Sequence, residues 1–304
     1  SDWRLLKNAA ISDDFGNMHD VSHNGRVGNT VTVNGRIHER FPVRAGERIR
    51  LRLINAANAR IFGLEFSEHQ PWIVALDGQP VEPHIPSGNR VVLGPAMRAD
   101  LVIDMGGKPG ERFSVIDSFY RGMAYRLLDL VYRDDAPIRS TAGERPSRLV
   151  ANPVAEPDLQ SAERHRIVFT GGMMGGMRSA MMDGKETDIR TLMHNGLVWA
   201  VNGVAAKGHM LTPLLTLARG RSYLLELVND TAWHHPMHLH GHVFRVVSRD
   251  GKPTQHREWL DTVLLNPRER AEIAFVADNP GDWMFHCHIL EHQSGGMMAV
   301  VRVV

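Results

Sequence analysis

Two short segments of this 304-residue chain carry side chains that bind transition metals. Residues 235–241 read HPMHLHG, and residues 286–292 read HCHILEH. Cys287 is the single cysteine of the chain, so no disulfide can form within it. Imidazole and thiolate are ligands that copper and zinc favour in proteins. The two segments together therefore predict metal chemistry.

The alternation of side chains along an extended segment divides these residues between two sites. In a strand, residues i and i+2 point to one face and residue i+1 points to the other. His286 and His288 are then expected to face one site, and Cys287 a different one. His238 and His240 have the same spacing and supply a second imidazole pair. The backbone around one cysteine would thus join two metal centres.

The ligand types favour copper at the cysteine site. A thiolate, two imidazoles and a weak axial thioether form the set typical of a blue copper electron-transfer site. Zinc is the less favoured alternative, because structural zinc sites usually take more thiolates. Ordinary solvated or core histidines are the remaining alternative, which fits a lone histidine better than two ordered clusters. The candidate ligands are His235, Cys287, His292 and Met297.

A third segment is rich in methionine. Five of the 15 methionines fall between residues 173 and 182. Thioethers select Cu(I), so uptake of cuprous ion is one interpretation, and adaptable packing is the other. The glycines at 171, 172, 175 and 176 argue against a stable helix there. The methionines concerned are Met173, Met174, Met177, Met181 and Met182.

The composition limits the possible classes of function. Lys and Arg total 35 against 34 Asp and Glu, a net charge of +1, so a basic surface for nucleic acid is not predicted. Apolar residues make up 43% of the chain, as in ordinary globular proteins. No apolar run approaches the roughly 20 residues of a membrane span. The length suits two domains.

Repeated patterns predict a duplicated domain of about 140 residues. VTVNG at 31–35 is echoed by WAVNG at 199–203. Each half also has three residues composed of Arg, Ala and Gly, at 44–46 and at 218–220. An asparagine, Asn55 or Asn229, follows nine residues after the glycine. A Pro-x-x-Arg-Ala pattern also recurs, beginning at Pro95 and at Pro267.

The segments within each repeat predict an all-β fold. Apolar and polar residues alternate as in half-buried strands, and Asn-Gly or Asp-Gly pairs predict tight turns. We expect two domains, each a β-sandwich or barrel. The expected limits are 1–140, a proline-containing linker at 141–163, and 164–304. The predicted strands cover 48–53, 99–103, 223–228 and 271–276, and the turns lie at 34–35, 77–78, 202–203 and 250–251.

The two histidine segments resemble the copper motifs of multicopper oxidases, the group that includes laccases, bacterial copper-efflux oxidases and ascorbate oxidase. Nearly the whole chain is similar to the second and third cupredoxin domains of the three-domain members. This resemblance implies two cupredoxin-like Greek-key β-sandwich or barrel domains. The resemblance implies a type 1 copper bound by His235, Cys287 and His292, with Met297 axial. For the trinuclear site it implies type 2 copper on His238 and a type 3 copper pair on His240, His286 and His288.

The chain departs from the family pattern in two respects. The family takes further ligands from two His-X-His motifs of an N-terminal domain, and no such motif precedes His238. The first repeat has residues 115–117 (VID) where the second has HCH, so its domain is expected to lack copper ligands. We therefore expect type 2 and type 3 copper only if a missing N-terminal domain or another chain supplies histidines. Gln293 stands where copper-efflux members commonly carry a proton-donating carboxylate.

The resemblance implies an oxidase that takes single electrons from Cu(I), a phenol or an aromatic amine and reduces molecular oxygen to water. Electrons are expected to enter at an exposed imidazole edge of His292 or His235 and to pass through Cys287 to His286 and His288. The alternative is a copper-binding or electron-transfer module, or an inactive proteolytic fragment, holding only type 1 copper. The family also implies a periplasmic or extracellular location, although this sequence shows no signal peptide.

Overall fold

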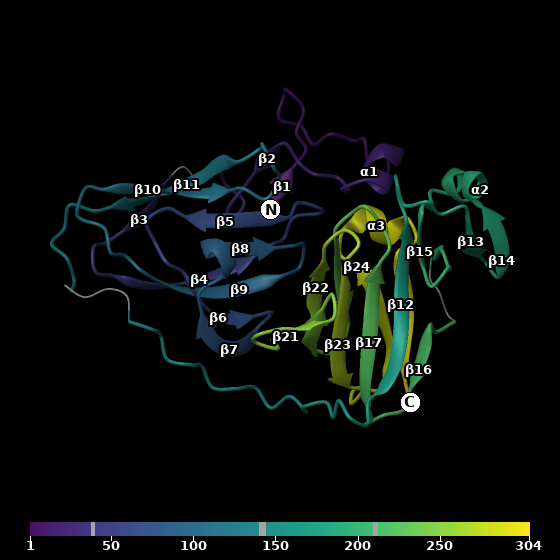
Figure 1. The fold of residues 1–304 in the computed structure, drawn as a ribbon. Helices are drawn as coiled ribbons and strands as arrows, with labels where there is room; N and C mark the ends of the chain where they lie inside the picture. The colour runs from purple at the N-terminus through teal and green to yellow at the C-terminus, as the bar shows by residue number, and fades with distance from the viewer. Residues whose placement is uncertain (38–39, 140–143, 209–211) are drawn as a thin grey trace. The chain divides into compact units, whose positions relative to one another are not determined.

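A computed structural model of the chain describes residues 1–37, 40–139, 144–208 and 212–304 (Figure 1). Strands far outnumber helices among these residues, which confirms the all-β expectation. The α-helices among them are short: α1 (Met18–Ser22), α2 (Ile189–His194) and α3 (Leu290–Ser294), with a 3₁₀ turn at Ser87–Asn89. None of the described helices has the length and apolar character needed to cross a membrane.

The described residues make two compact units that do not follow the order of the chain. Residues 4–27 and 58–60 pack with the second unit, and residues 144–152, beyond the predicted limit at 140, pack with the first. The domain limits 1–140, 141–163 and 164–304 stay a prediction, and residues 141–143 of the linker lie outside the described residues. Unit 1 is Ser1–Trp3, Gly28–Ala57 and Ile61–Asn152; unit 2 is Arg4–Val27, Asn58–Arg60 and Pro153–Val304.

Unit 1 contains a five-stranded sheet, a four-stranded sheet and a two-stranded ribbon. Leu101, Ile103 and Leu130 come from both larger sheets and are buried in one apolar core. The five-stranded sheet has the order β3 (Arg40–Val43), β11 (Tyr125–Tyr132), β10 (Arg112–Asp117), β5 (Phe62–Phe66), β8 (Arg90–Leu93). The others are β4 (Arg48–Ile54), β9 (Arg98–Asp104), β6 (Trp72–Leu76), β7 (Gln79–His84), and β1 (Asp2–Trp3) with β2 (Thr30–Val31).

Unit 2 contains a five-stranded sheet, a larger sheet and the small hairpin of β13 (Ser179–Met182) and β14 (Lys185–Asp188). The five-stranded sheet has the order β16 (Leu215–Leu217), β25 (Met298–Val303), β24 (Gly281–Cys287), β18 (His235–Leu239), β22 (Thr262–Leu265). The larger sheet has the order β15 (Trp199–Val201), β12 (Glu163–Gly171), β17 (Ser222–Asn229), β23 (Arg270–Val276), β19 (Phe244–Arg249), β20 (Lys252–Pro253), and β21 (Trp259–Leu260) pairs with β19.

The two five-stranded sheets share one topology. In each, the outer strand, β3 or β16, runs parallel to its neighbour, β11 or β25, whereas the other pairings are antiparallel. Because neighbouring strands are not consecutive in the chain, long connections must cross between sheets, as in Greek-key folds. This common order agrees with the duplication predicted from the repeated patterns.

The four predicted turns all adopt the backbone conformation that the sequence implies. Both residues of each Asn-Gly or Asp-Gly pair have positive φ, between 46° and 78°. A type I′ turn requires this conformation, which Asn, Asp and Gly tolerate best. Asp-Gly at 77–78 joins β6 to β7, and Asp-Gly at 250–251 joins β19 to β20.

The repeated asparagines fix equivalent turns. The Asn55 side-chain oxygen accepts the Ala57 backbone N–H at 2.9 Å, and the Asn229 oxygen accepts that of Thr231 at 3.1 Å. Both asparagines are buried, so these bonds satisfy amides that water cannot reach. In unit 2 this turn places the Thr231 hydroxyl beside the ring of His235, the first residue of the segment 235–241.

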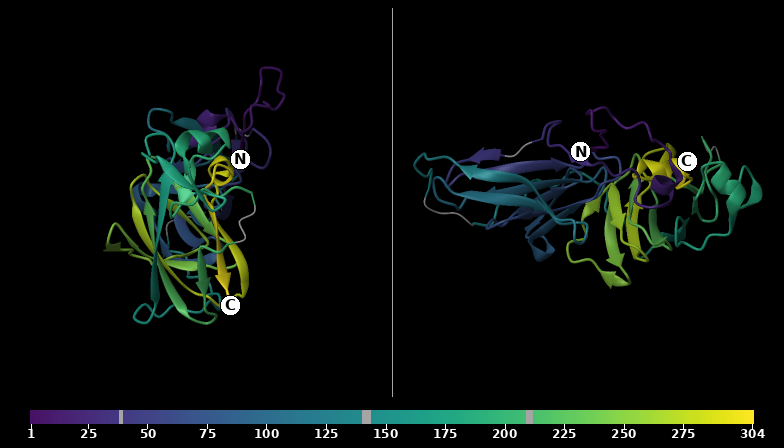
Figure 2. Two further views of the ribbon diagram at one scale, coloured as in Figure 1. Left: turned by 90° about the vertical axis from the view of Figure 1, so that its right-hand side faces the viewer. Right: turned by 90° about the horizontal axis from the view of Figure 1, so that it is seen from above.

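The N-terminal part of unit 2 brings α1 beside α3 (Figure 2). Asn17 begins α1 by accepting the Asp20 backbone N–H with its side-chain oxygen. Asp20 is itself buried and accepts two hydrogen bonds from the Arg4 guanidinium, at 2.6 and 2.9 Å. A paired carboxylate and a side-chain cap thus hold a helix too short to be stable alone.

Candidate metal centre

The pairing of β18 with β24 sorts the histidine segments onto two faces of the sheet. Met237 lies opposite Cys287, and His238 lies opposite His286. Side chains alternate along both strands, so His235 shares the face of Cys287. The predicted division of the two segments between two sites is therefore present in the fold.

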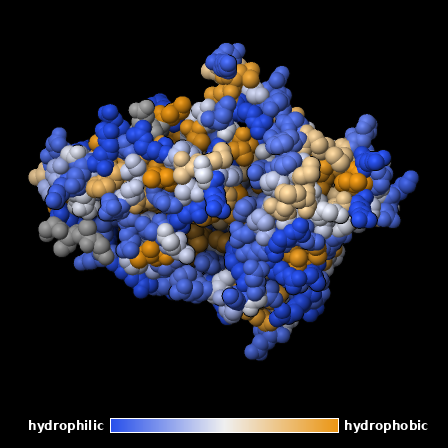
Figure 3. Space-filling view, turned by 45° about the horizontal axis from the view of Figure 1, so that its top comes forward, coloured by the Kyte–Doolittle hydropathy of each residue, from blue (hydrophilic) through white to orange (hydrophobic). Residues whose placement is uncertain are grey.

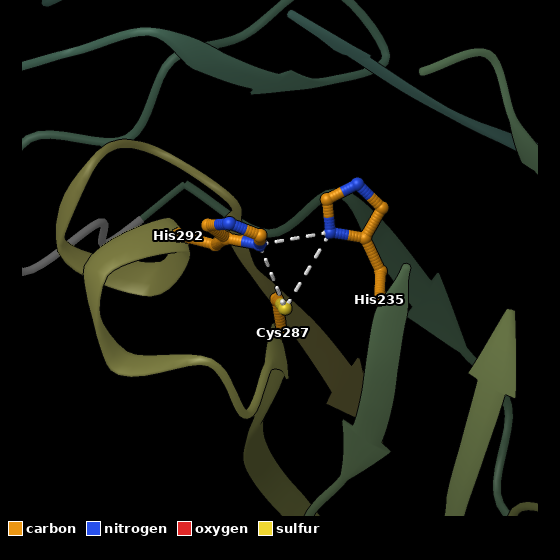
Figure 4. Close-up of side chains that lie close together, drawn as sticks. All are labelled: His235, Cys287 and His292. Carbon is orange, nitrogen blue, oxygen red and sulfur yellow. Dashed lines mark hydrogen bonds between the residues drawn. The ribbon is translucent and has the colours of Figure 1, made fainter. Parts of the chain in front are cut away.

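His235, Cys287 and His292 converge on one face of that sheet (Figure 4). The Cys287 sulfur lies 3.6 Å from Nδ1 of each histidine, and the two Nδ1 atoms lie 3.1 Å apart. Among the residues that the structure describes, this is the one group of three or more His, Cys, Asp or Glu whose ligand atoms all lie within 4.8 Å of one another. We call it the triad.

Hydrogen bonds at the far nitrogens fix which ring atom carries the proton. Nε2 of His292 lies 2.6 Å from the His23 carbonyl oxygen, which can only accept, so Nε2 donates. Nε2 of His235 lies 2.8 Å from the Thr231 hydroxyl. That hydroxyl is 2.7 Å from the Asn229 side-chain oxygen and donates to it, so it accepts from His235. Both Nδ1 atoms therefore turn unprotonated lone pairs toward the sulfur.

Burial keeps the triad uncharged in the protein itself. All three side chains are fully buried, and this burial lowers the pKa of His292 to about 3 and that of His235 well below its ordinary value. Burial raises the pKa of the Cys287 thiol. The Nδ1 lone pairs of the two histidines and the cysteine sulfur face one another and repel. A cation bound between them would offset that repulsion.

The triad fits a transition metal in size and in donor type. Its separations are those of nitrogen and sulfur ligands about 2.0 to 2.3 Å from a shared ion. Met297 is also fully buried, and its backbone accepts the Cys287 N–H at 3.1 Å and donates to the His292 carbonyl at 2.9 Å. The backbone thus places Met297 beside the triad, while its predicted axial role stays a prediction.

The two histidine segments contain four further histidines, which lie on the opposite face of the same sheet. Neighbouring ring centroids are 4.7 to 5.9 Å apart, and Nε2 of His240 lies 3.1 Å from Nε2 of His286. We call this group, His238, His240, His286 and His288, the four-histidine cluster. Its side chains are brought together as predicted, and their assignment to particular copper ions stays a prediction.

Carbonyl groups orient two rings of this cluster. Nδ1 of His238 donates to the Asp261 carbonyl at 2.9 Å, and Nδ1 of His286 donates to the Cys287 carbonyl at 2.9 Å. Each ring thereby keeps an unprotonated Nε2 available as a ligand. Burial lowers the pKa of His286 to about 4, and neighbouring His288 adds to that effect, so the ring stays neutral near pH 7.

The expectation of an exposed imidazole edge is wrong. Both His235 and His292 have 0% of their surface exposed. The backbone at His23, just after α1, covers the far edge of His292 and accepts its hydrogen bond. Sequence reasoning missed this because a backbone carbonyl leaves no signature in residue types.

Three successive carbonyls at the end of α1 are bonded to the body of unit 2. Carbonyls at the C-terminus of a helix lack partners within it and need donors from elsewhere. Those of Val21, Ser22 and His23 accept from the Trp199 indole at 2.7 Å, the Met173 backbone at 2.9 Å and the His292 imidazole at 2.6 Å, respectively. We call residues 17–26, which include α1, the strap.

Trp199 is a further residue that sequence reasoning did not assign to the site. Its buried ring lies 4.5 Å from the His292 ring and 5.1 Å from the His235 ring, measured between centroids. It closes one side of the triad against water. The only signal for it was its place in the repeated pattern at 199–203.

The methionine-rich segment does not act as one unit. Residues 172–178 form turns and coil, as the glycines predicted, before β13 begins. Met177 and Met182 pack against a buried apolar cluster, whereas Met173, Met174 and Met181 are exposed by 49%, 67% and 38%. The face drawn in Figure 3 is mostly hydrophilic, with apolar side chains in separate small areas. Packing explains two of the five methionines.

Comparisons with known proteins place this geometry in a family. A profile described as multicopper oxidase matches residues 3–126, and a second with that description matches residues 181–304. The multicopper oxidase of Staphylococcus epidermidis is 28% identical over 283 residues, covering 92% of this chain and 53% of that protein. The chain spans about half the length of the curated relatives it matches.

Two solved structures are similar over almost the whole chain. A multicopper oxidase from Pseudomonas thermotolerans is 32% identical with a TM-score of 0.82, over 100% of this chain and 66% of that one. A multicopper oxidase from Pseudomonas parafulva is 33% identical with a TM-score of 0.78, over 99% and 67%. These matches confirm the predicted cupredoxin-like fold. The chain therefore belongs to the multicopper oxidase family, and copper is the metal that its donor set and its relatives imply.

Proposed function

We propose that this chain carries the substrate-oxidising centre of a laccase-like or cuprous oxidase. His235, Cys287 and His292, with Met297 as a further ligand, would hold a type 1 copper that takes one electron from the substrate. A trinuclear copper site would reduce oxygen to water. The observation that carries the proposal is the buried triad, in which a thiol and two unprotonated nitrogens lie within 3.6 Å of one another.

Copper bound there supplies one-electron redox chemistry with a thiolate ligand. The protein's own residues determine the surroundings. The His23 carbonyl and the Thr231 hydroxyl hold both imidazoles in the tautomer a metal needs. Complete burial excludes water from the sulfur. Peptide bonds join Cys287 to His286 and His288, which gives a short covalent path between the triad and the four-histidine cluster.

The four-histidine cluster supplies half of the proposed trinuclear site, with His238 for type 2 copper and the other three for the type 3 pair. We propose that a further cupredoxin domain or another chain supplies the remaining ligands. A cavity of about 380 Å³ lies beside His238 and Asp261, so there is room next to this ring for additional groups.

Copper reconstitution tests the proposal. The chain is titrated with Cu(II) and then treated with a reductant under anaerobic conditions. We expect blue absorption that saturates at one copper in the triad and bleaches on reduction, because thiolate coordination produces it. Cys287→Ser should lack this absorption, and His194→Ala, which alters an exposed histidine on α2, should keep it. Blue absorption that survives Cys287→Ser would refute the proposal.

An electron-transfer module with type 1 copper alone, or an inactive fragment of that kind, is the second candidate. It is favoured because no His-X-His motif precedes His238 in this sequence, so the chain itself offers only the four-histidine cluster toward a trinuclear site. Air separates the candidates. The chain is first combined with the further cupredoxin domain or chain that completes the trinuclear site. A reduced oxidase then turns blue again as it consumes oxygen, whereas an electron-transfer module or inactive fragment stays bleached.

The donor and the location are further parts of the proposal. Exposed Met173, Met174 and Met181 offer thioethers that favour Cu(I) as a donor, with phenols and aromatic amines as the other class. Family resemblance supports a periplasmic or extracellular location. Neither part affects the assignment of the triad.

A further inference from the structure

The strap carries a small aromatic cluster on its outer side. The rings of His19 and His23 are stacked, with centroids 4.2 Å apart and planes 13° apart. Trp233 approaches the His23 ring edge-on at 5.0 Å. The His19 side chain is 80% exposed, so the face of its ring that turns away from His23 is open to solvent. The stack thus ends in an accessible aromatic surface.

This cluster lies one hydrogen bond from the triad. The His23 carbonyl accepts the His292 Nε2–H at 2.6 Å. Trp233 is tied to the same place, because its indole N–H donates to the Met173 carbonyl at 2.8 Å and the Met173 N–H donates to Ser22 at 2.9 Å. The surface ring and the buried imidazole are therefore held in one connected network.

Buried carboxylates anchor the strap on both sides of the cluster. Asp20 accepts two hydrogen bonds from Arg4, at 2.6 and 2.9 Å. Glu291, next to the triad in sequence, accepts the Arg26 backbone N–H at 2.9 Å and the Asn58 amide at 2.7 Å. Exposure of Asp20 and Glu291 is only 5% and 8%. A ring docked on this segment would meet a surface that is fixed rather than loose.

The ring geometry selects the kind of ligand. The lone pair of an imidazole lies in the plane of its ring. Two rings stacked 13° from parallel cannot direct their lone pairs at one ion, so the pair is unsuited to chelating a metal. Stacked and edge-on rings instead extend naturally to another flat ring at the open face.

We propose that His19, His23 and Trp233 form a docking site for a planar, electron-rich aromatic donor, which stacks on the open face of His19. The inference rests on the proposed function and adds the place on the protein surface where its electron donor binds. The donor reduces the centre without touching His292, because His23 and its carbonyl bridge the gap. A phenol gives one electron to the oxidised copper centre and its hydroxyl proton to water, and leaves as a phenoxyl radical.

Binding to the copper-free protein tests the site without any oxidation. The histidine ring protons are followed by NMR while p-methoxyphenol is added. We expect saturable ring-current shifts at His19 and His23, affinity about threefold to tenfold weaker in His19→Ala, and near-normal affinity in His19→Phe. His194→Ala, a matched change on another short helix, should bind normally. Absent shifts, or equal affinity in His19→Ala, would overturn the docking site.

Anaerobic reduction of the copper-loaded protein gives a second readout. His19→Ala should slow reduction by subsaturating p-methoxyphenol about threefold to tenfold and leave reduction by dithionite unchanged. Recovery in His19→Phe supports stacking, whereas a Phe variant as slow as the Ala variant contradicts it. If the unsubstituted chain never forms a blue centre, the proposed function fails, while the NMR titration still decides the docking site.

Discussion

At the scale of the residue, one buried hydroxyl determines how His235 faces the triad. Thr231 has no exposed surface and lies between the His235 ring and the Asn229 side chain. It accepts from the ring because Asn229 takes its proton. That one bond keeps the proton on Nε2 and the lone pair on Nδ1, where a metal needs it. We therefore expect copper affinity to depend on a residue that is not itself a candidate ligand.

Replacing this hydroxyl by a methyl group should weaken metal binding. In Thr231→Val the buried His235 Nε2–H loses its acceptor, a cost of about 1 to 3 kcal/mol that moving the proton to Nδ1 would relieve. A proton on Nδ1 must then leave before copper binds, so affinity should fall by about tenfold or more. Competition with a copper chelator measures it. Thr231→Ser is the control and should bind normally; equal affinity in the Val variant would contradict the argument.

Sequence reasoning found the side chains of the triad but not the groups that hold them in place. His235, Cys287 and His292 were predictable because their chemistry is rare and their spacing matches a strand. The Asp261 carbonyl, the His23 carbonyl and Thr231 act through positions that only the folded chain brings close. Common residue types and backbone atoms leave no pattern from which such contacts can be inferred.

At the scale of the element, the sequence could predict the arrangement of β18 and β24 but not the strap that covers the triad. The alternation in HCH predicted correctly that one strand serves two faces. The strap was not predicted, because residues 4–27 pack with a sheet far along the chain. The strap is attached to the rest of unit 2 by the carbonyl groups at the end of α1 and by close packing at Gly25. The backbone of Gly25 is left-handed (φ 75°) and lies close to Ile289 and Ala59.

A side chain at Gly25 should loosen the strap. A Cβ there would lie 2.7 Å from Ala59 Cβ and closer still to Ile289, and it would also strain the positive φ. We expect Gly25→Ala to destabilise unit 2 by about 2 to 4 kcal/mol, from backbone strain and overpacking together. Faster hydrogen exchange at residues 18–23 and a lower denaturant midpoint would show it.

Gly16 offers the matched control for that prediction. It lies just before the strap with a similar φ of 68°, but a Cβ there meets nothing within 4 Å. Gly16→Ala should therefore cost only the backbone strain, about 1 to 2 kcal/mol. Equal exchange and equal stability in the two variants would show that close packing at Gly25 does not hold the strap.

At the scale of the whole molecule, the two five-stranded sheets share one strand order, but only the sheet of unit 2 carries candidate metal ligands. β10 of unit 1 and β24 of unit 2 occupy the same place in matching sheets. Where β24 carries Cys287 between histidines, β10 carries buried Val115 and ends at Asp117, which accepts the Gly63 N–H at 2.9 Å. The sequence predicted this contrast, since the repeats align and the candidate metal ligands appear in one copy only.

The central claim is that the triad binds copper through one sulfur and two nitrogens. X-ray absorption at the copper edge of the chain loaded with one equivalent of copper tests it most directly. The account predicts one short copper–thiolate distance and two copper–nitrogen distances, with the short copper–sulfur distance lost in Cys287→Ser. A copper shell of nitrogen and oxygen alone in the unsubstituted chain, or a short copper–sulfur distance retained in Cys287→Ser, would contradict it.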